Sequence, residues 1–258
     1  MNYIDYILKK VLYDLQEFFR LVYDSLKKLF IPPVYYNEAI EQLDIIGVGS
    51  LKIVLLTGLF TGMVLALQTA QTLATFGAKN YVGKIVSASM VRELGPVLCC
   101  LMLAGRVSSG IAAELGAMVV TDQINAMRAM GSDPVRKLVI PRMIAGLIAA
   151  PALTMLADFV GLLGGWLICI LLLYVNSTLY WRSSIDALTY SDIFSGLAKP
   201  ICFGFIVVMV GCYYGLNTKG GTRGVGNSTT NSVVTSSILI LASDFFLTKL
   251  FFAIFATY

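Results

Sequence analysis

Long apolar stretches alternate with short polar segments along the whole chain. The clearest apolar stretch lies between Lys52 and Lys79, where 26 consecutive residues carry no charge. About 20 apolar residues in a helix cross the hydrocarbon core of a bilayer, so this stretch is long enough to span a membrane. Comparable stretches follow it, and the pattern predicts five membrane-spanning helices, at residues 47–77, 86–113, 142–175, 199–216 and 233–256.

Two of the predicted spans contain residues that are unusual in a membrane. The second span carries Arg92, Glu93 and Arg106, and we accept it as a crossing because the spans on either side require one. The third span contains Pro151, which predicts a kink, and Asp158 near its middle. Residues 176–198 combine aromatic side chains with scattered charges, which is typical of an external interfacial helix or loop.

The first part of the chain has a different pattern. Within residues 1–33, apolar side chains recur at helical spacing along one stripe, and charged side chains fill the other face. Because charges interrupt the stripe, it predicts an amphipathic helix that lies in the membrane interface and that Pro32 and Pro33 end. The alternative is a soluble amphipathic helix packed on the cytoplasmic face.

The polar segment between the second and third spans predicts a short helix at residues 121–131, about 13 Å long at 1.5 Å per residue. Thr121 is placed to cap its start, and Gly131 suits its end. Asp133 followed by Pro134 suits the start of the next helix. One face of the short helix carries three apolar residues, Ile124, Met127 and Met130. A docking helix for a soluble partner and an ordinary interfacial loop both fit this spacing.

Small residues recur at a spacing of four within the spans. They form the pairs Gly58–Gly62, Gly161–Gly165 and Gly211–Gly215, and the stripe Ala104, Ser108, Ala112 and Gly116. Such stripes let helices approach closely in lipid, so together they predict a compact bundle. We find no internal repeat, which leaves the inverted-repeat architecture of many secondary transporters without support.

The composition agrees with a membrane protein, because 57% of the residues are hydrophobic and 13% are charged, whereas soluble domains carry about 25% charged residues. The chain has no histidine, which excludes histidine-based metal sites and histidine base catalysis. Its five cysteines show neither zinc-ligand nor CxxC spacing, so we expect no metal site and no disulfide.

Basic residues favour one side of the membrane. If the spans alternate in direction, 13 of the 19 lysines and arginines fall before the first span, around the central polar segment, or in the glycine-rich run 219–226. The positive-inside rule therefore predicts a cytoplasmic N-terminus and central segment, and a C-terminus outside. The glycine-rich run lacks the order of a phosphate-binding loop, so we interpret it as a flexible cytoplasmic loop and expect no ATP hydrolysis by this chain.

Five motifs carry a resemblance to a known family: R-E-L-G-P-V-L (92–98), A-G-R (104–106), A-A-E-L-G-A-M (112–118), T-D-Q-I-N-A-M (121–127) and G-S-D-P (131–134). These resemble the MlaE/YrbE family, the permease subunits of lipid-transporting ABC systems that work with MCE proteins. The resemblance covers most of the chain and implies a single permease domain, 1–258. Related sequences usually have glutamate where Asp122 stands and often an acidic residue where Arg128 stands. The departure at Arg128 reverses a charge, so the surface of the docking partner opposite this residue should differ from that in the relatives.

The resemblance implies an all-α multi-pass protein of the bacterial inner membrane that forms a homodimer beneath a ring of MCE subunits. A separate cytoplasmic ATPase would bind ATP and Mg and grip the 121–131 coupling helix, and a small STAS-like accessory protein would be compatible. No cofactor is expected in this chain, and nucleic acid is not an expected partner. The residues expected to couple to the ATPase are Glu114, Met118, Thr121, Asp122, Gln123, Met127, Arg128, Met130 and Asp133.

A lipid site is expected near the outer ends of the first two spans. A charge deep in a span costs about 2.5–3.5 kcal/mol, so Arg92 and Glu93 should face protein, water or a head group. Lys199 lies at a similar depth and could neutralise Glu93. The resemblance favours a polar collar over an apolar chamber for acyl chains, against a salt bridge above ordinary core. The predicted lipid-binding residues are Leu65, Gln68, Thr72, Leu73, Phe76, Arg92, Glu93, Leu94 and Lys199.

Two other functions remain open at this point. A proton- or ion-coupled secondary carrier would use the intramembrane acids Asp158 and Asp244, although pairing or helix capping is the more common role of such acids. A membrane scaffold for an MCE ring would transport nothing. The function that we predict is the permease of an ABC transporter that moves phospholipid between the inner membrane and an MCE protein.

Overall fold

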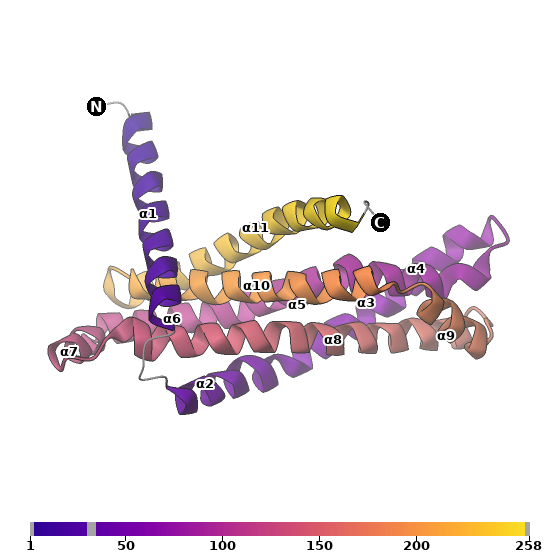
Figure 1. The fold of residues 1–258 in the computed structure, drawn as a ribbon, viewed down its shortest axis with the longest axis horizontal. Coiled ribbons are helices and arrows are strands. Elements are labelled where there is room, and N and C mark those ends of the chain that lie inside the picture. Colours follow the sequence, from indigo (N-terminus) through magenta and orange to yellow (C-terminus); the bar gives the residue numbers. More distant parts are fainter. Residues whose placement is uncertain (1–2, 30–34, 256–258) are drawn as a thin grey trace.

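The computed structural model describes residues 3–29 and 35–255, and this part of the chain is helical with no strand (Figure 1). The α-helices are α1 (Tyr3–Leu29), α2 (Tyr36–Leu43), α3 (Gly49–Ala74), α4 (Val82–Ser89), α5 (Gly95–Leu103), α6 (Ser109–Val120), α7 (Gln123–Ala129), α8 (Ile140–Leu171), α9 (Ser177–Asp186), α10 (Tyr190–Leu216) and α11 (Gly221–Phe255). π-Helical turns at Asp44–Val48, Met90–Leu94, Ala104–Ser108 and Val135–Val139, and a 3₁₀ turn at Lys79–Tyr81, join several of them into longer rods.

Five rods in the described residues are long and apolar enough to cross a membrane, which confirms the predicted fold class. They run over Tyr36–Ala74, Lys79–Val120, Val135–Leu171, Tyr190–Leu216 and Gly221–Phe255. Most of them extend further than the predicted spans, because a charged residue ends an apolar run without ending the backbone hydrogen bonding of a helix. Residue 256, predicted as the end of the last span, lies outside the described residues.

Two segments predicted as connections are largely helical. Residues 176–198 contain α9 and the first turns of α10, which begins in a capping box formed by Thr189 and Asp192. The helix that contains the predicted fourth span therefore begins nine residues before residue 199. The glycine-rich run 219–226 is also not a loop, because α11 begins at Gly221 directly after Gly220, whose φ of 93° only glycine adopts easily.

The glycine pairs lie where the spans cross. A Cβ added at Gly62 would stand 1.9 Å from the carbonyl oxygen of Gly161, and one added at Gly58 would stand 2.6 Å from that of Ala157. Thus α3 and α8 touch backbone to backbone. Gly211 lies in the same way against Ser108, which brings α10 onto the second span. The predicted compact packing through small residues is confirmed at these crossings.

Helix α1 runs across the long axis of the bundle, as Figure 1 shows. Its second half is attached to the bundle: Phe18 meets Tyr213 of α10 edge to face, with ring centroids 5.7 Å apart, and Ser25 is fully buried. Its side away from the bundle exposes large apolar side chains, among them Leu12, Phe19 and Tyr23. This is the geometry that the predicted interfacial helix requires. Pro32 and Pro33, expected to end it, lie outside the described residues.

Candidate functional site

The turn between the second and third spans contains the predicted docking helix as α7, which is shorter than the expected 121–131. Ile124 is its buried residue and points into the bundle, Met127 is half-buried, and Met130 directly after the helix is 75% exposed. The side chains of Thr121, Asp122, Gln123 and Arg128 are exposed as well. The apolar and polar groups that remain accessible thus form one outward surface around α7.

The start of α7 differs from the prediction. Thr121 does not cap the helix, because its hydroxyl donates back to the carbonyl oxygen of Ala117 at 2.9 Å. The residue before the helix is Asp122, whose backbone is left-handed with φ of 57°. Asn125 donates to the Asp122 side chain at 2.9 Å and so stabilises this turn. In the sequence Thr121 resembles an N-cap because the apolar positions of a helix follow it. In the structure the residue directly before the helix is Asp122, one position later.

The end of α7 agrees with the prediction. Gly131 has φ of 76°, and the amide of Ser132 donates to the carbonyl oxygen of Met127 at 2.9 Å, which is the usual glycine stop. Asp133 then accepts a hydrogen bond from the amide of Val135 at 3.0 Å, so it caps the third span as expected. Its other carboxylate oxygen accepts a hydrogen bond from Lys28 of α1.

These contacts set the pKa of Asp133. Partial burial alone would raise the pKa of this carboxyl group, but the hydrogen bond and charge of Lys28 and the Val135 amide outweigh burial and hold it below its ordinary value. The carboxylate is therefore charged at neutral pH, and it joins α1 to the turn that carries α7.

A second ion pair connects the helices on either side of this turn. Arg142, only 3% exposed, pairs with Glu114 at 2.7 Å and donates to the carbonyl oxygen of Leu138 at 2.9 Å. It connects the middle of α6 to the beginning of the third span. Of the predicted coupling residues, Glu114 and Asp133 are thus engaged within the chain, and the exposed ones surround α7. The sequence did not indicate the Arg142–Glu114 pair, because nothing in its pattern aligns residues across a turn.

At the opposite end of the bundle, Lys199 stands at the centre of a polar cluster although its side chain is 2% exposed. Its ammonium group pairs with Glu93 at 2.7 Å and with Asp244 at 3.0 Å. It also donates to the Arg92 carbonyl oxygen at 3.0 Å and to the Thr248 hydroxyl at 2.8 Å. The predicted Glu93–Lys199 contact is confirmed. Asp244 is paired, as expected of an intramembrane acid.

Arg92 completes this cluster from the other side. It binds Asp192 of α10 through two nitrogens, at 2.6 Å and 2.9 Å, and Asp192 also caps the start of α10. The five charged groups of the cluster are therefore two cations and three carboxylates. A phosphate attracted to Arg92 would have to compete with Asp192. The sequence pattern did not predict that Asp192 and Thr248 belong to this cluster, because both lie far along the chain from Arg92 and Glu93.

An open groove of about 320 Å³ lies beside the second half of α3. Its lining consists of Phe60, Thr61, Val64, Leu65, Gln68 and Leu94. Three predicted lipid-binding residues, Leu65, Gln68 and Leu94, meet here. Thr72 is exposed further along α3, and Leu73 packs partly against a small core beneath α4 and α9.

Phe76 does not belong to the helical face on which it was predicted. α3 ends at Ala74, because Gly77 adopts φ of 68° and the amide of Ala78 returns to the carbonyl oxygen of Leu73 at 2.9 Å. Phe76 therefore lies in the turn, 78% exposed. The glycine after the aromatic residue was the signal for this helix end.

The π-helical turn Met90–Leu94 supplies side chains both to the polar cluster and to the groove. Arg92 and Glu93 line the polar cluster, together with a small cavity of about 80 Å³ that Phe251, Phe252 and Phe255 of α11 complete. Leu94 lines the groove. The groove and the polar cluster are thus separate sites. The polar cluster, which was expected to form a collar over the lipid chamber, lies beside the groove.

Asp158 departs from the expectation of a paired acid. One of its carboxylate oxygens is buried without a hydrogen-bond partner among residues 3–29 and 35–255. The side chain lies against Gly95, where an added Cβ would stand 1.7 Å from that oxygen. In the same described residues, no group of three acidic, cysteine or histidine side chains could hold a metal ion.

Comparisons with known proteins find one matching family model and several similar permease proteins. The sequence model of the family described as Permease MlaE matches residues 39–250. A probable ABC transporter permease protein of Rickettsia prowazekii is 44% identical over 230 residues, 89% of each chain. A probable ABC transporter permease protein of Synechocystis is 43% identical over 216 residues, 84% of this chain and 82% of that one. The intermembrane phospholipid transport system permease protein MlaE of Haemophilus influenzae is 37% identical over 219 residues, 84% of each.

Proposed function

The chain belongs to the MlaE permease family of ABC transporters, and from this premise we propose that it moves phospholipid between the inner membrane and an MCE protein while a separate cytoplasmic ATPase supplies the energy. The observation that carries the proposal is the surface around α7. This short helix lies between two spans, and Met130 and Arg128 are exposed at its end. Such a surface is suited to docking by a soluble subunit.

The proposed complex has several parts beyond this chain. The ATPase would bind ATP and Mg, an MCE ring would receive or deliver the lipid on the outer side, and a small STAS-like protein would be an optional component. We place α7 and the N-terminus in the cytoplasm and the C-terminus in the periplasm, in keeping with the concentration of basic residues on one side.

We also propose that two copies of this chain pair in the membrane. Two asparagines near the start of the long helix α11, Asn227 and Asn231, are exposed, and lipid would offer them no hydrogen-bond partners where this helix enters the membrane. The second span, which packs against α11, exposes Gly105 and Gly110, beside which an added Cβ would meet nothing within 4 Å. Small and polar residues together are typical of helix–helix interfaces in lipid, so a second copy is a suitable cover.

Met130→Asp should prevent the ATPase from docking. The change places a charge in an apolar contact, and burying an unpaired charge is costly, so we expect at least about tenfold weaker binding. Met130→Gln, which is neutral and similar in length, should weaken binding much less. Because Met130 is 75% exposed, neither change should alter the fold of the permease. Binding of the purified ATPase to the permease in nanodiscs measures the effect.

The same variants test the function in proteoliposomes. We expect lipid transfer to require ATP, to fall with Met130→Asp, and to continue when an ionophore collapses the proton gradient. Transfer that stops with the ionophore and ignores ATP would identify a secondary carrier, and a complex that binds ATPase and MCE ring but moves no lipid would be a scaffold. For a carrier, Asp244 would first have to leave its ion pair with Lys199.

A photo-crosslinking side chain at Val64 should capture phospholipid in a manner that depends on ATP. Val64 lines the groove beside α3 and is 50% exposed, and Ile148 of α8 is a control with a similar exposure of 53%. Ordinary contact with the bilayer should label both positions equally, with or without nucleotide. We expect capture at Val64 to change several-fold on addition of ATP and capture at Ile148 to stay constant. If both respond alike, the groove is only a lipid-facing surface.

A further inference from the structure

Helices α1 and α7 belong to different parts of the chain, yet they are joined at one residue. Asp133 follows α7 by four residues and uses both carboxylate oxygens. One accepts the Val135 amide at 3.0 Å and fixes the start of the third span, and the other accepts the ammonium group of Lys28 near the end of α1. Both side chains of this ion pair are 31% exposed.

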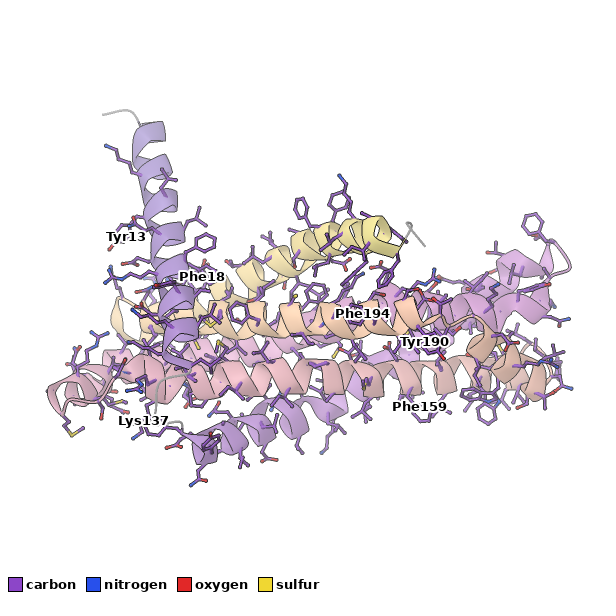
Figure 2. The ribbon with its side chains drawn as sticks, viewed as in Figure 1. Tyr13, Phe18, Lys137, Phe159, Tyr190 and Phe194 are labelled. Atoms are coloured by element: carbon purple, nitrogen blue, oxygen red, sulfur yellow. The ribbon has the colours of Figure 1, made fainter. Side chains whose placement is uncertain are left out.

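The half of α1 that carries Lys28 is firmly held. Phe18, which Figure 2 labels on α1, packs on Tyr213. Leu21, Val22 and Leu29 pack against the main core of the bundle. α1 also contacts the π-helical turn Val135–Val139 directly. Lys28 is therefore presented from a fixed helix end, which lowers the entropy lost when it pairs with Asp133.

α7, in contrast, is held at few points. It is a helix of seven residues with Ile124 as its buried residue, and its main neighbour is α6. A left-handed residue bounds it on either side, Asp122 with φ of 57° and Gly131 with φ of 76°. Because α7 has few contacts of its own, its direction depends on what holds the chain directly before and after it.

We propose that the Lys28–Asp133 ion pair is the tie through which the interfacial helix α1 sets the position of α7. Lys28 is then a positioning residue for docking: it acts through Asp133 and does not belong to the exposed surface around α7. The tie also connects α7 to the membrane surface, because α1 exposes an apolar side that includes Leu12 and Phe19. The role of α7 as the docking helix rests on the proposed function, whereas the tie itself does not.

The test uses the whole permease in nanodiscs and measures amide hydrogen exchange in residues 123–132. Lys28→Met removes the charge and keeps the aliphatic stem, and Asp133→Asn removes the charge but keeps an oxygen that can cap Val135. We expect each change to speed exchange by about threefold to fivefold, the effect of one partly exposed ion pair. The double variant should equal either single one, because the two residues act as a unit. Lys27→Met is the matched control, since Lys27 is exposed and has no such partner in the described residues.

The outcomes separate the tie from the proposed function. If Asp133→Asn speeds exchange and Lys28→Met does not, Asp133 is only a helix cap and the proposal is wrong. Additive effects in the double variant would also overturn it. With the ATPase present, Lys28→Met should weaken binding by a similar factor. If exchange rises as expected and ATPase binding ignores both Lys28→Met and Met130→Asp, the tie stands and the proposed docking role of α7 fails.

Discussion

Gly62→Leu is expected to leave little or no folded protein in the membrane. At this position α3 and α8 touch through their backbones, and an added Cβ would stand 1.9 Å from the Gly161 oxygen and 2.5 Å from the Gly161 carbonyl carbon. Neither atom is the flexible end of a side chain, so the two helices would have to separate. Overpacking in a core costs about 1–3 kcal/mol when side chains can adjust, and we expect a larger loss here. Yield and thermal unfolding of the purified chain measure it.

Gly226→Leu is the matched control for this prediction. Gly226 also lies inside a helix, but a Cβ added there meets nothing within 4 Å, and leucine favours helix more than glycine does. The control should therefore retain normal yield and thermal stability. A stable Gly62→Leu protein would show that the close approach of α3 and α8 is not required for folding.

Lys199→Met is expected to lower stability by about 3 kcal/mol and to reduce lipid transfer by more than tenfold. The substitution leaves Glu93 and Asp244 without the cation that both contact, at low dielectric. Removing one member of a buried pair costs more than removing all of them, because the remaining charge stays unpaired. The partial exposure of the Glu93 side chain, 41%, keeps the expected loss at the lower end of the usual range. Thermal unfolding and proteoliposome transfer give the two readouts.

The triple change Lys199→Met, Glu93→Gln and Asp244→Asn should recover most of the stability, since no unpaired charge is left. Lys249→Met, which alters an exposed lysine of the same region, should change neither stability nor transfer. If the triple variant is as unstable as Lys199→Met, the cluster contributes through shape and not through charge, and our account of it is incorrect.

The sequence alone predicted those features that have a local cause. Apolar stretches gave the five spans, the spacing of Gly58 and Gly62 gave a helix crossing, and Gly131 and Asp133 gave the end of one helix and the start of the next. The Glu93–Lys199 contact is a long-range exception, and it was predicted because both residues were placed at a similar depth in the membrane. Thr189 and Asp192 have the spacing of a capping box, but the predicted fourth span begins further along, where the apolar stretch begins.

The other contacts between distant polar residues could not be predicted. Arg92 meets Asp192 and Lys28 meets Asp133 across about a hundred residues, and no periodicity aligns such partners. The groove beside α3 was placed only in part, because a face drawn on an ideal helix ignores where the helix ends, as Phe76 shows. The π-helical turns were invisible for a related reason: a span is apolar on most sides, so an extra residue disturbs no pattern.

Those π-helical turns bear on how the length of the second span can change in evolution. Losing one residue from a regular α-helix rotates everything beyond it by about 100°, which moves every packing face away from its neighbour. A π turn holds one residue more than an α turn, so a deletion within Met90–Leu94 or Ala104–Ser108 can convert it to an α turn with both flanking faces kept in place. In the first of these turns the lost residue would come from the segment that supplies side chains to both the polar cluster and the groove. Single-residue gaps in this span are therefore compatible with an intact bundle, and they would alter the presentation of Arg92, Glu93 and Leu94 before they altered the fold.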